Sequence, residues 1–260
     1  MGLMKLIQLT PLICILIPVP VLGQEVLDIK DSLKEAAYQG DAVAQFNLGF
    51  KYESGAGVIQ DFAEAIKWYQ MAADQGHIGA QVNLGNMYLM GKEVPQNYTE
   101  AMKWYRKAAD QGHTVAQYNL GLSYEDGRGV PQDYSEAMKW YRNAADQGYS
   151  AAQHNIATLY VLGKGVPLNY TEAERWYRKA ADQGYPNSQL GLGVLYCNGN
   201  GVPQDYVLAH MWVNLAATSS NGELQQAAAK LREEIAEKMT FEEIATAQKL
   251  AREWIEKHNK

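Results

Sequence analysis

Histidine is the side chain best suited to acid–base or metal chemistry near neutral pH, and this chain has few of them. The five histidines are His77, His113, His154, His210 and His258. His77 and His113 lie 36 residues apart, and tyrosine takes the equivalent place farther along the chain, which indicates a packing or surface role. Because a closed metal site needs three or four ligands, we predict no metal site.

No serine, cysteine or glycine stretch forms a recognised catalytic motif. The sequence lacks Ser-x-x-Lys, Gly-x-Ser-x-Gly, His-Glu-x-x-His and a phosphate-binding glycine loop. The pair Gly127 and Gly129 follows a predicted helix and not a strand, so we interpret it as a helix stop. We therefore predict no catalytic residues, no cofactor and no enzymatic activity.

The first 23 residues differ from the rest of the chain. Lys5 precedes an apolar run, Leu6 to Leu22, which predicts a cleaved signal peptide over residues 1–23 and a periplasmic or secreted protein. An uncleaved membrane anchor is the alternative. The run is short for a span and holds three prolines, so we expect no stable membrane span after cleavage. Cleavage would leave Cys197 as the only cysteine, and packing alone would then hold the fold together.

The charge balance is mildly acidic. The chain has 23 Lys and Arg against 29 Asp and Glu, a net charge of −6, with no basic run. Nucleic acid is therefore not an expected partner, because binding phosphates needs a basic stripe. The balance mildly favours a basic protein partner.

A period of 36 residues organises the chain. Tyrosines recur at Tyr52, Tyr88, Tyr124, Tyr160 and Tyr196, tryptophans at Trp68, Trp104, Trp140, Trp176 and Trp212, and glutamines at Gln45, Gln81, Gln117, Gln153 and Gln189. Five repeats follow, at 41–76, 77–112, 113–148, 149–184 and 185–220. A fixed period of this length is typical of solenoid proteins.

Each repeat is predicted to form two helices, which we call helix A and helix B. In the third repeat, helix A should run from about Val115 to Glu125, and glycine follows it in all five repeats, as a left-handed helix end requires. Asp133 and Glu136 predict a capping box at the start of helix B. In that box Glu136 would return a hydrogen bond to the Asp133 N–H.

Small residues recur inside both helices. Helix A carries glycine at one internal position in four repeats and Ala157 in the fourth repeat. This pattern indicates a close approach between helices. We expect leucine at Gly121 to disrupt the third repeat, and alanine there to be mild.

A pair of helices cannot bury its apolar faces alone, so the repeats must stack on one another. The sequence therefore predicts an all-α fold, an α/α superhelical solenoid of five repeats over 41–220. Residues 24–40 are expected to form an N-terminal capping half-repeat. Residues 221–260 are expected to form C-terminal capping helices, over Glu223–Lys238 and Phe241–Lys257.

The run AQYNLGLSYEDGRGVPQDYSEAMKWYRNAADQG, Ala116 to Gly148, resembles the Sel-1-like repeat, a relative of the tetratricopeptide repeat. The tail from Met239 to Trp254 is also similar to that of many bacterial members. The resemblance implies a scaffold for protein–protein interaction, and bacterial members are often exported. A cysteine-rich branch described as β-lactam-binding carries a disulfide pair in each repeat, which this chain does not have.

Positions on helix A that differ between repeats are the best candidates for contact with a partner. The predicted partner-binding residues are Phe46, Asn47, Phe50, Asn83, Tyr118, Asn119, Leu122, His154 and Asn155. The asparagine series Asn47, Asn83, Asn119 and Asn155 has an alternative role, in which each forms a hydrogen bond within its own repeat.

We expect an exported scaffold whose concave surface holds a protein or peptide partner. Two alternatives remain open on the sequence: a cell-wall hydrolase or β-lactam-binding protein, and a secreted effector that binds a host protein.

Overall fold

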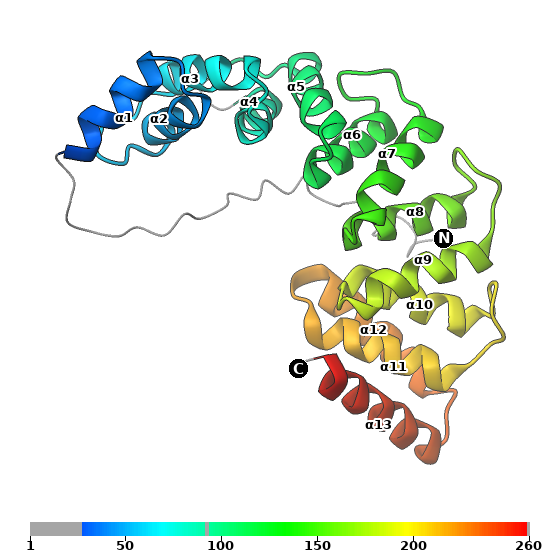
Figure 1. The fold of residues 1–260 in the computed structure, drawn as a ribbon. Helices are drawn as coiled ribbons and strands as arrows, with labels where there is room; N and C mark the ends of the chain where they lie inside the picture. Colours follow the sequence, from blue (N-terminus) through cyan, green and yellow to red (C-terminus); the bar gives the residue numbers. More distant parts are fainter. Residues whose placement is uncertain (1–27, 92–93, 259–260) are drawn as a thin grey trace. The chain divides into compact units, whose positions relative to one another are not determined.

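The fold is all α-helical, as predicted. A computed structural model describes residues 28–91 and 94–258, in which thirteen helices and no strands occur. Within each unit, the helices pack against one another as antiparallel neighbours or near neighbours in the chain (Figure 1). The predicted signal peptide over residues 1–23 lies outside the described residues. Within the described ranges, no helix is both long and apolar enough to cross a membrane.

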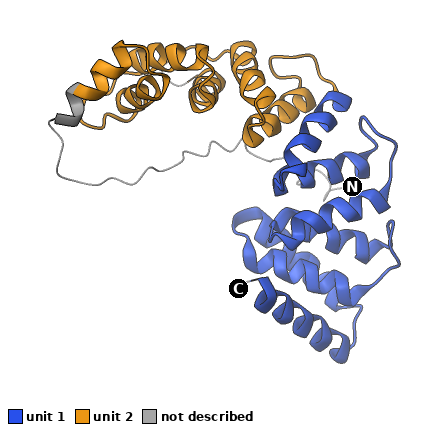
Figure 2. Ribbon diagram, in the orientation of Figure 1, with its two compact units in different colours: residues 1–8, 134–260 blue, residues 9–133 orange. Residues whose placement is uncertain are grey.

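The helices fall into two compact units (Figure 2). Unit 2 contains α1 (Asp28–Tyr38), α2 (Ala42–Ser54), α3 (Phe62–Asp74), α4 (Ile78–Met90), α5 (Tyr98–Asp110) and α6 (Thr114–Asp126). Unit 1 contains α7 (Tyr134–Asp146), α8 (Ser150–Leu162), α9 (Tyr170–Asp182), α10 (Pro186–Asn198), α11 (Tyr206–Ser219), α12 (Gly222–Ala236) and α13 (Phe241–His258). Even-numbered helices from α2 to α10 are helix A of each repeat, and odd-numbered helices from α3 to α11 are helix B.

Each helix A ends at a left-handed glycine, as predicted. These C-cap residues are Gly55, Gly91, Gly127, Gly163 and Gly199, with φ from 63° to 74°. The glycine two positions later does more than end a helix. A Cβ atom on Gly129 would lie 2.5 Å from the carbonyl carbon of Tyr98, at the start of α5 in the preceding repeat. Gly165 and Gly201 approach Tyr134 and Tyr170 in the same way, so this glycine lets the loop dock on its neighbour.

At the equivalent position of the first repeat, only half of a capping box forms. Asp61 Oδ1 accepts a hydrogen bond from the Glu64 N–H at 3.0 Å, but the Glu64 carboxylate pairs with Lys67. The Asp61 N–H instead donates to the carbonyl oxygen of Tyr52 at the end of α2, at 2.9 Å. The same backbone bond joins Asn97 to Tyr88, Asp133 to Tyr124, Asn169 to Tyr160 and Asp205 to Tyr196. This backbone bond needs no glutamate. The fifth repeat therefore keeps it, although Leu208 stands where the other repeats have the glutamate.

The close approach inferred from the small residues is present. A Cβ atom on Gly85 in α4 would lie 2.6 Å from Cε1 of Tyr105, a fully buried side chain of α5. Gly49 meets Tyr69 in the same way, at 2.8 Å. The expectation that alanine is mild at this repeat position does not extend to these two glycines, because an added methyl group would overlap the tyrosine ring.

A buried glutamine on helix A joins three helices (helix B of the preceding repeat, helix A itself, and helix B of its own repeat). Gln81 Nε2 donates to the carbonyl oxygen of Ala73 at the end of α3, at 3.1 Å, and its Oε1 accepts from Gln111 Nε2 at the end of α5, at 2.8 Å. Only 2% of Gln81 is exposed. The Ala73 carbonyl also accepts from the Gly76 N–H at 3.0 Å, so the next repeat supplies a second donor to this carbonyl at the helix end.

Both ends of the repeat array use the same glutamine contact. Gln45 donates to the carbonyl oxygen of Ala37 in α1 at 3.1 Å, so α1 serves as the helix B that would precede the first repeat. In the fifth repeat Ser219 stands where earlier repeats have glutamine, and its Oγ donates to Gln189 Oε1 at 3.1 Å. α12 and α13 follow. Thr240 and Glu243 form the predicted capping box at the start of α13, with Thr240 N donating to Glu243 Oε2 at 2.7 Å.

We predict that Gly85→Ala destabilises the protein by about 1–3 kcal/mol, because the methyl group must displace the Tyr105 ring. Ala157→Gly is the matched control at the same repeat position, where the cost should be only about 0.5–1 kcal/mol of helix propensity. Urea unfolding of the two variants checks this prediction. An alanine variant at position 85 as stable as wild type would contradict the close packing.

We also predict that Gln81→Met destabilises by about 1–3 kcal/mol, because two hydrogen bonds are lost, one from the Gln111 amide and one to the Ala73 carbonyl, each contributing about 0.5–1.5 kcal/mol. Gln70→Met is the control, since the Gln70 amide bonds only to Asp74 on its own helix. Thermal unfolding should show a clearly lower midpoint for the variant at position 81 alone. Equal midpoints would mean that the glutamine contact adds little.

Candidate partner-binding surface

The predicted contact residues of the first two repeats lie at least partly open on α2 and α4 of unit 2. Asn47 is exposed, and Phe46, Phe50 and Asn83 are half-buried. Phe46 stacks on the ring of His77, with ring centroids 4.5 Å apart. These side chains therefore combine an aromatic surface with open amide groups.

The predicted contact residues of the third and fourth repeats are buried in the structure. Tyr118, Asn119 and His154 are exposed by only 1–2%, and Leu122 and Asn155 by 6% and 7%. The structure thus separates the nine candidates into an open group on α2 and α4 and a buried group on α6 and α8. Partner binding by the buried group stays a prediction.

The helix A position that Phe50 holds in the first repeat is Asn86 in the second and Thr158 in the fourth, and this variation has a reason inside the fold. Asn86 Oδ1 accepts a hydrogen bond from the Tyr105 hydroxyl at 2.5 Å, and Thr158 Oγ1 lies 3.1 Å from the Tyr177 hydroxyl. In the first repeat Phe50 holds this position, and Glu53 accepts from the helix B tyrosine instead. In these three repeats, the residue at the Phe50 position therefore differs together with the group that forms a hydrogen bond with the buried helix B tyrosine hydroxyl.

Burial raises the pKa of Tyr69 and of Tyr177 and keeps their hydroxyls protonated as donors. Desolvation raises the pKa of Tyr177 to about 12, against a smaller lowering by the bond with Thr158. Desolvation, with the adjacent Glu53 carboxylate, also raises the pKa of Tyr69. The phenols are structural donors at neutral pH.

The asparagine series does not form the local hydrogen bonds considered as its alternative role. Among the described residues, no hydrogen bond joins the side chain of Asn47, Asn83, Asn119 or Asn155 to its own repeat. Asn83 instead acts on the Tyr69 hydroxyl of the preceding repeat. The exposed amide of Asn47 is therefore available to a partner, and the half-buried Asn83 lies beside Tyr69.

His77 and His113 are N-caps of helix A. His77 Nδ1 accepts a hydrogen bond from the Ala80 N–H, and His113 Nδ1 accepts one from the Ala116 N–H, each at 3.2 Å. Asp41 caps α2 in the same way. Desolvation lowers the pKa of both histidines, which favours the neutral ring that such a bond requires. These residues cap helices, a role that the sequence analysis missed although aspartate stands at the same position in the first repeat.

His154 is buried between repeats. Its Nδ1 lies 3.0 Å from Ser188 Oγ, and its ring packs against Tyr177 and Tyr185. Desolvation lowers its pKa to about 3, so the ring is neutral in the folded protein.

No cluster of three or more metal-ligating residues occurs in residues 28–91 and 94–258. Cys197 is buried and has no disulfide partner, and burial raises the pKa of its thiol, which makes it a poor nucleophile.

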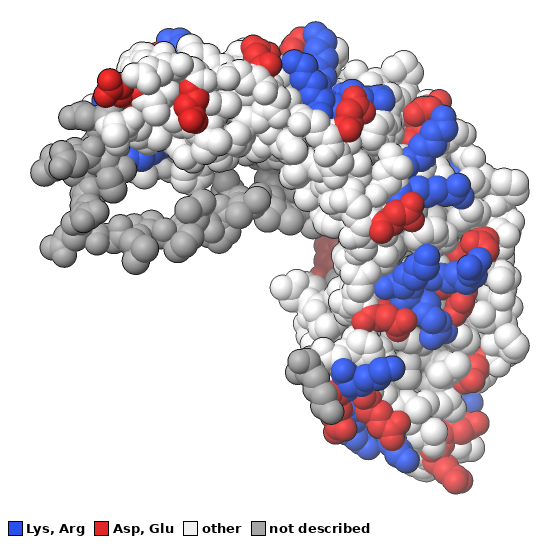
Figure 3. Space-filling view, in the orientation of Figure 1, with Lys and Arg blue, Asp and Glu red and all other residues white. Residues whose placement is uncertain are grey.

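The helix B surface is charged but balanced. Lys103 pairs with Glu100 at 2.5 Å, and an equivalent pair occurs on α3, α7 and α9. Arg106 reaches across to the next repeat and donates to the Tyr124 hydroxyl at 2.7 Å. Figure 3 shows acidic and basic side chains interspersed in both units. With its charges paired in this way, the helix B surface offers no single-sign patch to a partner.

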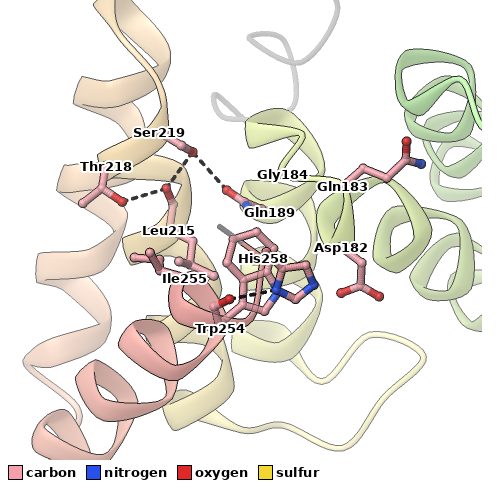
Figure 4. A pocket seen from close by; sticks show the side chains of 10 residues that line it. All are labelled: Asp182, Gln183, Gly184, Gln189, Leu215, Thr218, Ser219, Trp254, Ile255 and His258. Carbon is pink, nitrogen blue, oxygen red and sulfur yellow. Dashed lines mark hydrogen bonds between the residues drawn. The ribbon is translucent and has the colours of Figure 1, made fainter. Parts of the chain in front are cut away.

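A cavity of about 500 Å³ opens at the C-terminal end of unit 1 (Figure 4). It is lined by Asp182, Gln183, Gly184, Gln189, Leu215, Thr218, Ser219, Trp254, Ile255 and His258. The sequence analysis did not predict this cavity. The feature that could have indicated it is Ser219, a short side chain at the position where the earlier repeats have glutamine.

The chain belongs to the Sel1 repeat family. The family's sequence model matches residues 42–77, 78–113, 114–149, 150–185 and 186–221, which are the repeats described above shifted by one residue. Sel1 repeats are generally scaffolds for protein–protein interaction, and proteins built from them are typically non-catalytic.

Two solved structures are similar to this chain over most of its length. One is a protective antigen present in uropathogenic Escherichia coli strains that displays an SLR fold, with 36% identity and a TM-score of 0.75 over 88% of this chain. This chain spans 48% of that protein's length. The other is a Sel1 repeat protein from Oxalobacter formigenes, with 31% identity and a TM-score of 0.76 over 88% of this chain and 94% of that one. A search of curated proteins gives no match.

The burial of His154 predicts a stability that falls in acid. Its pKa is lowered from 6.5 by folding, so its contribution is complete above pH 6.5 and is lost as the pH falls towards about 3. His154→Phe, which places there the residue found at position 46, should remove this dependence. The stability of wild type relative to the variant should fall by about 1.4 kcal/mol per pH unit below 6.5. Urea unfolding from pH 7 to pH 5 measures it, and parallel pH profiles would contradict the prediction.

Proposed function

We propose that this chain is an exported scaffold that binds a protein or peptide partner through α2 and α4. The observation that carries the proposal is the open group of Phe46, Asn47, Phe50 and Asn83, where aromatic surface adjoins amides that no residue of the same repeat engages. Side-chain amides can hold an extended peptide backbone, and partly open aromatic rings are common anchors in interfaces.

The constant side chains support the same proposal. The recurring glycines, tyrosines and glutamines are occupied in joining helices to one another. Asn47 is exposed and makes no contact of this kind, and the neighbouring helix A position, Phe46, differs between repeats. A scaffold that keeps its packing residues alike and varies part of its surface is suited to binding, and the family's general role agrees with it.

Export is supported by the apolar run before residue 24 and by the similarity to a protective antigen. Fractionation of the native cells by osmotic shock, with sequencing of the protein's N-terminus, tests it. A mature protein that begins near Gln24 in the periplasmic fraction or the medium is expected. An uncleaved cytoplasmic protein would overturn this part of the proposal.

We predict that a photo-crosslinking residue placed at Phe50 in native cells captures one defined partner, and that Asn47→Arg in the same chain reduces the yield several-fold. The Asn47 side chain is exposed and makes no hydrogen bond within its own repeat, so the substitution should leave the unfolding midpoint unchanged. Ala63→Arg, on the exposed side of α3, is the control and should keep the yield. The proposal fails if the same partner crosslinks equally well from Lys67 on helix B, or if Asn47→Arg has no effect.

A further inference from the structure

Asparagine stands directly before glycine at three places in unit 1. These pairs are Asn198 with Gly199, Asn200 with Gly201, and Asn221 with Gly222. In such a pair the main-chain nitrogen of the glycine can attack the side-chain carbonyl carbon of the asparagine, because glycine has no Cβ atom to hinder the approach. The attack needs a nitrogen that is free of hydrogen bonds and a main chain that is free to rotate. The three pairs differ in both respects.

At the first pair the attacking nitrogen is already occupied. Asn198 is the last residue of α10, and the Gly199 N–H donates to the carbonyl oxygen of Leu195 as part of the left-handed helix end. Attack would require the last turn of α10 to open. This hydrogen bond therefore protects Asn198, although its side chain is exposed.

At the second pair the preceding repeat fixes the main chain. A Cβ atom on Gly201 would lie 2.5 Å from the carbonyl carbon of Tyr170, at the start of α9. The Gly201 carbonyl oxygen accepts a hydrogen bond from the Thr171 hydroxyl at 3.3 Å. The Asn200 N–H also donates to the Leu195 carbonyl oxygen at 3.0 Å. Rotation of the peptide between Asn200 and Gly201 would break these contacts.

The third pair meets both requirements. Asn221 and Gly222 are exposed, and the Asn221 side chain forms no capping hydrogen bond with α12, whereas Asn97 and Asn169 cap their helices. The Gly222 N–H is the first of α12, where a helix offers no acceptor, and it forms no hydrogen bond within the described ranges. Apart from neighbouring main chain, no heavy atom lies within 4 Å of the place that a Cβ atom on Gly222 would occupy.

We propose that Asn221 is a site of spontaneous deamidation in the folded protein. The Gly222 nitrogen forms a bond to the Asn221 Cγ atom and closes a succinimide ring. The side-chain amide nitrogen leaves as ammonia, together with the proton that the Gly222 nitrogen gives up. A solvent water molecule then adds to one of the two ring carbonyl carbons and opens the ring, which leaves aspartate or isoaspartate at position 221. The proposal does not depend on the proposed function.

The reaction changes the junction between α11 and α12. Both products add a negative charge beside the N–H groups of the first turn of α12, where a helix favours an anion. The isoaspartate product also lengthens the main chain by one carbon atom. Since α12 packs against α11 (Figure 1) and places Ala228 and Ile235 in the core of unit 1, the change falls where the C-terminal capping helices join the repeats.

Peptide mapping by mass spectrometry tests the proposal, with fragmentation to assign each of the three asparagines. The purified protein is aged at mildly alkaline pH, once folded and once in guanidinium chloride, and the rate of conversion when folded is divided by the rate when unfolded. This ratio removes the effect of local sequence. We expect a ratio near one at Asn221 and at most about one tenth at Asn198 and Asn200, which must open locally to react. A ratio at Asn221 as low as the other two would overturn the proposal.

A pair of variants provides an independent measurement. Ageing of the folded protein should produce a more acidic species, which ion-exchange chromatography separates. Asn221→Asp removes the reacting amide and should not accumulate this species, whereas the matched variant Asn198→Asp should accumulate it at the wild-type rate. Accumulation at the wild-type rate in Asn221→Asp would refute the site.

Discussion

The fold depends on one buried amide contact that recurs in each repeat. A helix ends with carbonyl groups that lack intrahelical partners, and burying them without partners would cost free energy. The glutamine on helix A gives one such carbonyl of the preceding helix B a second donor, beside the backbone N–H of the glycine that follows that helix. It also accepts a bond from the end of its own helix B. Because the glutamine is buried, its geometry is demanding, and a neighbouring repeat can supply this second donor only when it stacks in register.

The glutamine contact explains why the other constant residues have the types they do. Bringing the Gln81 amide to the end of α3 places α4 and α5 so close that Gly85 has no room for a methyl group beside Tyr105. The tyrosine hydroxyl is then buried in turn and needs an acceptor, which Asn86 supplies. One polar contact thus determines a small residue, a large one and a polar partner. A change at any of them must be compensated at the others, as Ala157 and Thr158 show for Tyr177 in the fourth repeat.

The sequence predicts the fold well because the period and the residue types carry the same information. The helix pairs, the left-handed glycines and the close approach at the glycine position all follow from local rules and from comparing repeats. The sequence did not show which atoms meet across repeats. The N–H of Asp61 bonds to the Tyr52 carbonyl, and the glutamate expected to bind it pairs with a lysine instead, because backbone partners leave no trace in side-chain types. The capping role of His77 was missed for a related reason, since histidine is an uncommon cap.

The candidate sites show where a repeat protein can gain specificity. Positions held constant by the packing cannot vary without cost, so new chemistry must arise where that packing is relaxed. On α2 and α4 the packing constraint is weaker at side chains that form no hydrogen bond within their own repeat. At the end of unit 1 it is relaxed because no sixth repeat follows. The serine at position 219 still satisfies Gln189 with a shorter side chain, beside the cavity that opens there. The end of a repeat array is therefore a place where a cavity can form without any change in the repeats themselves.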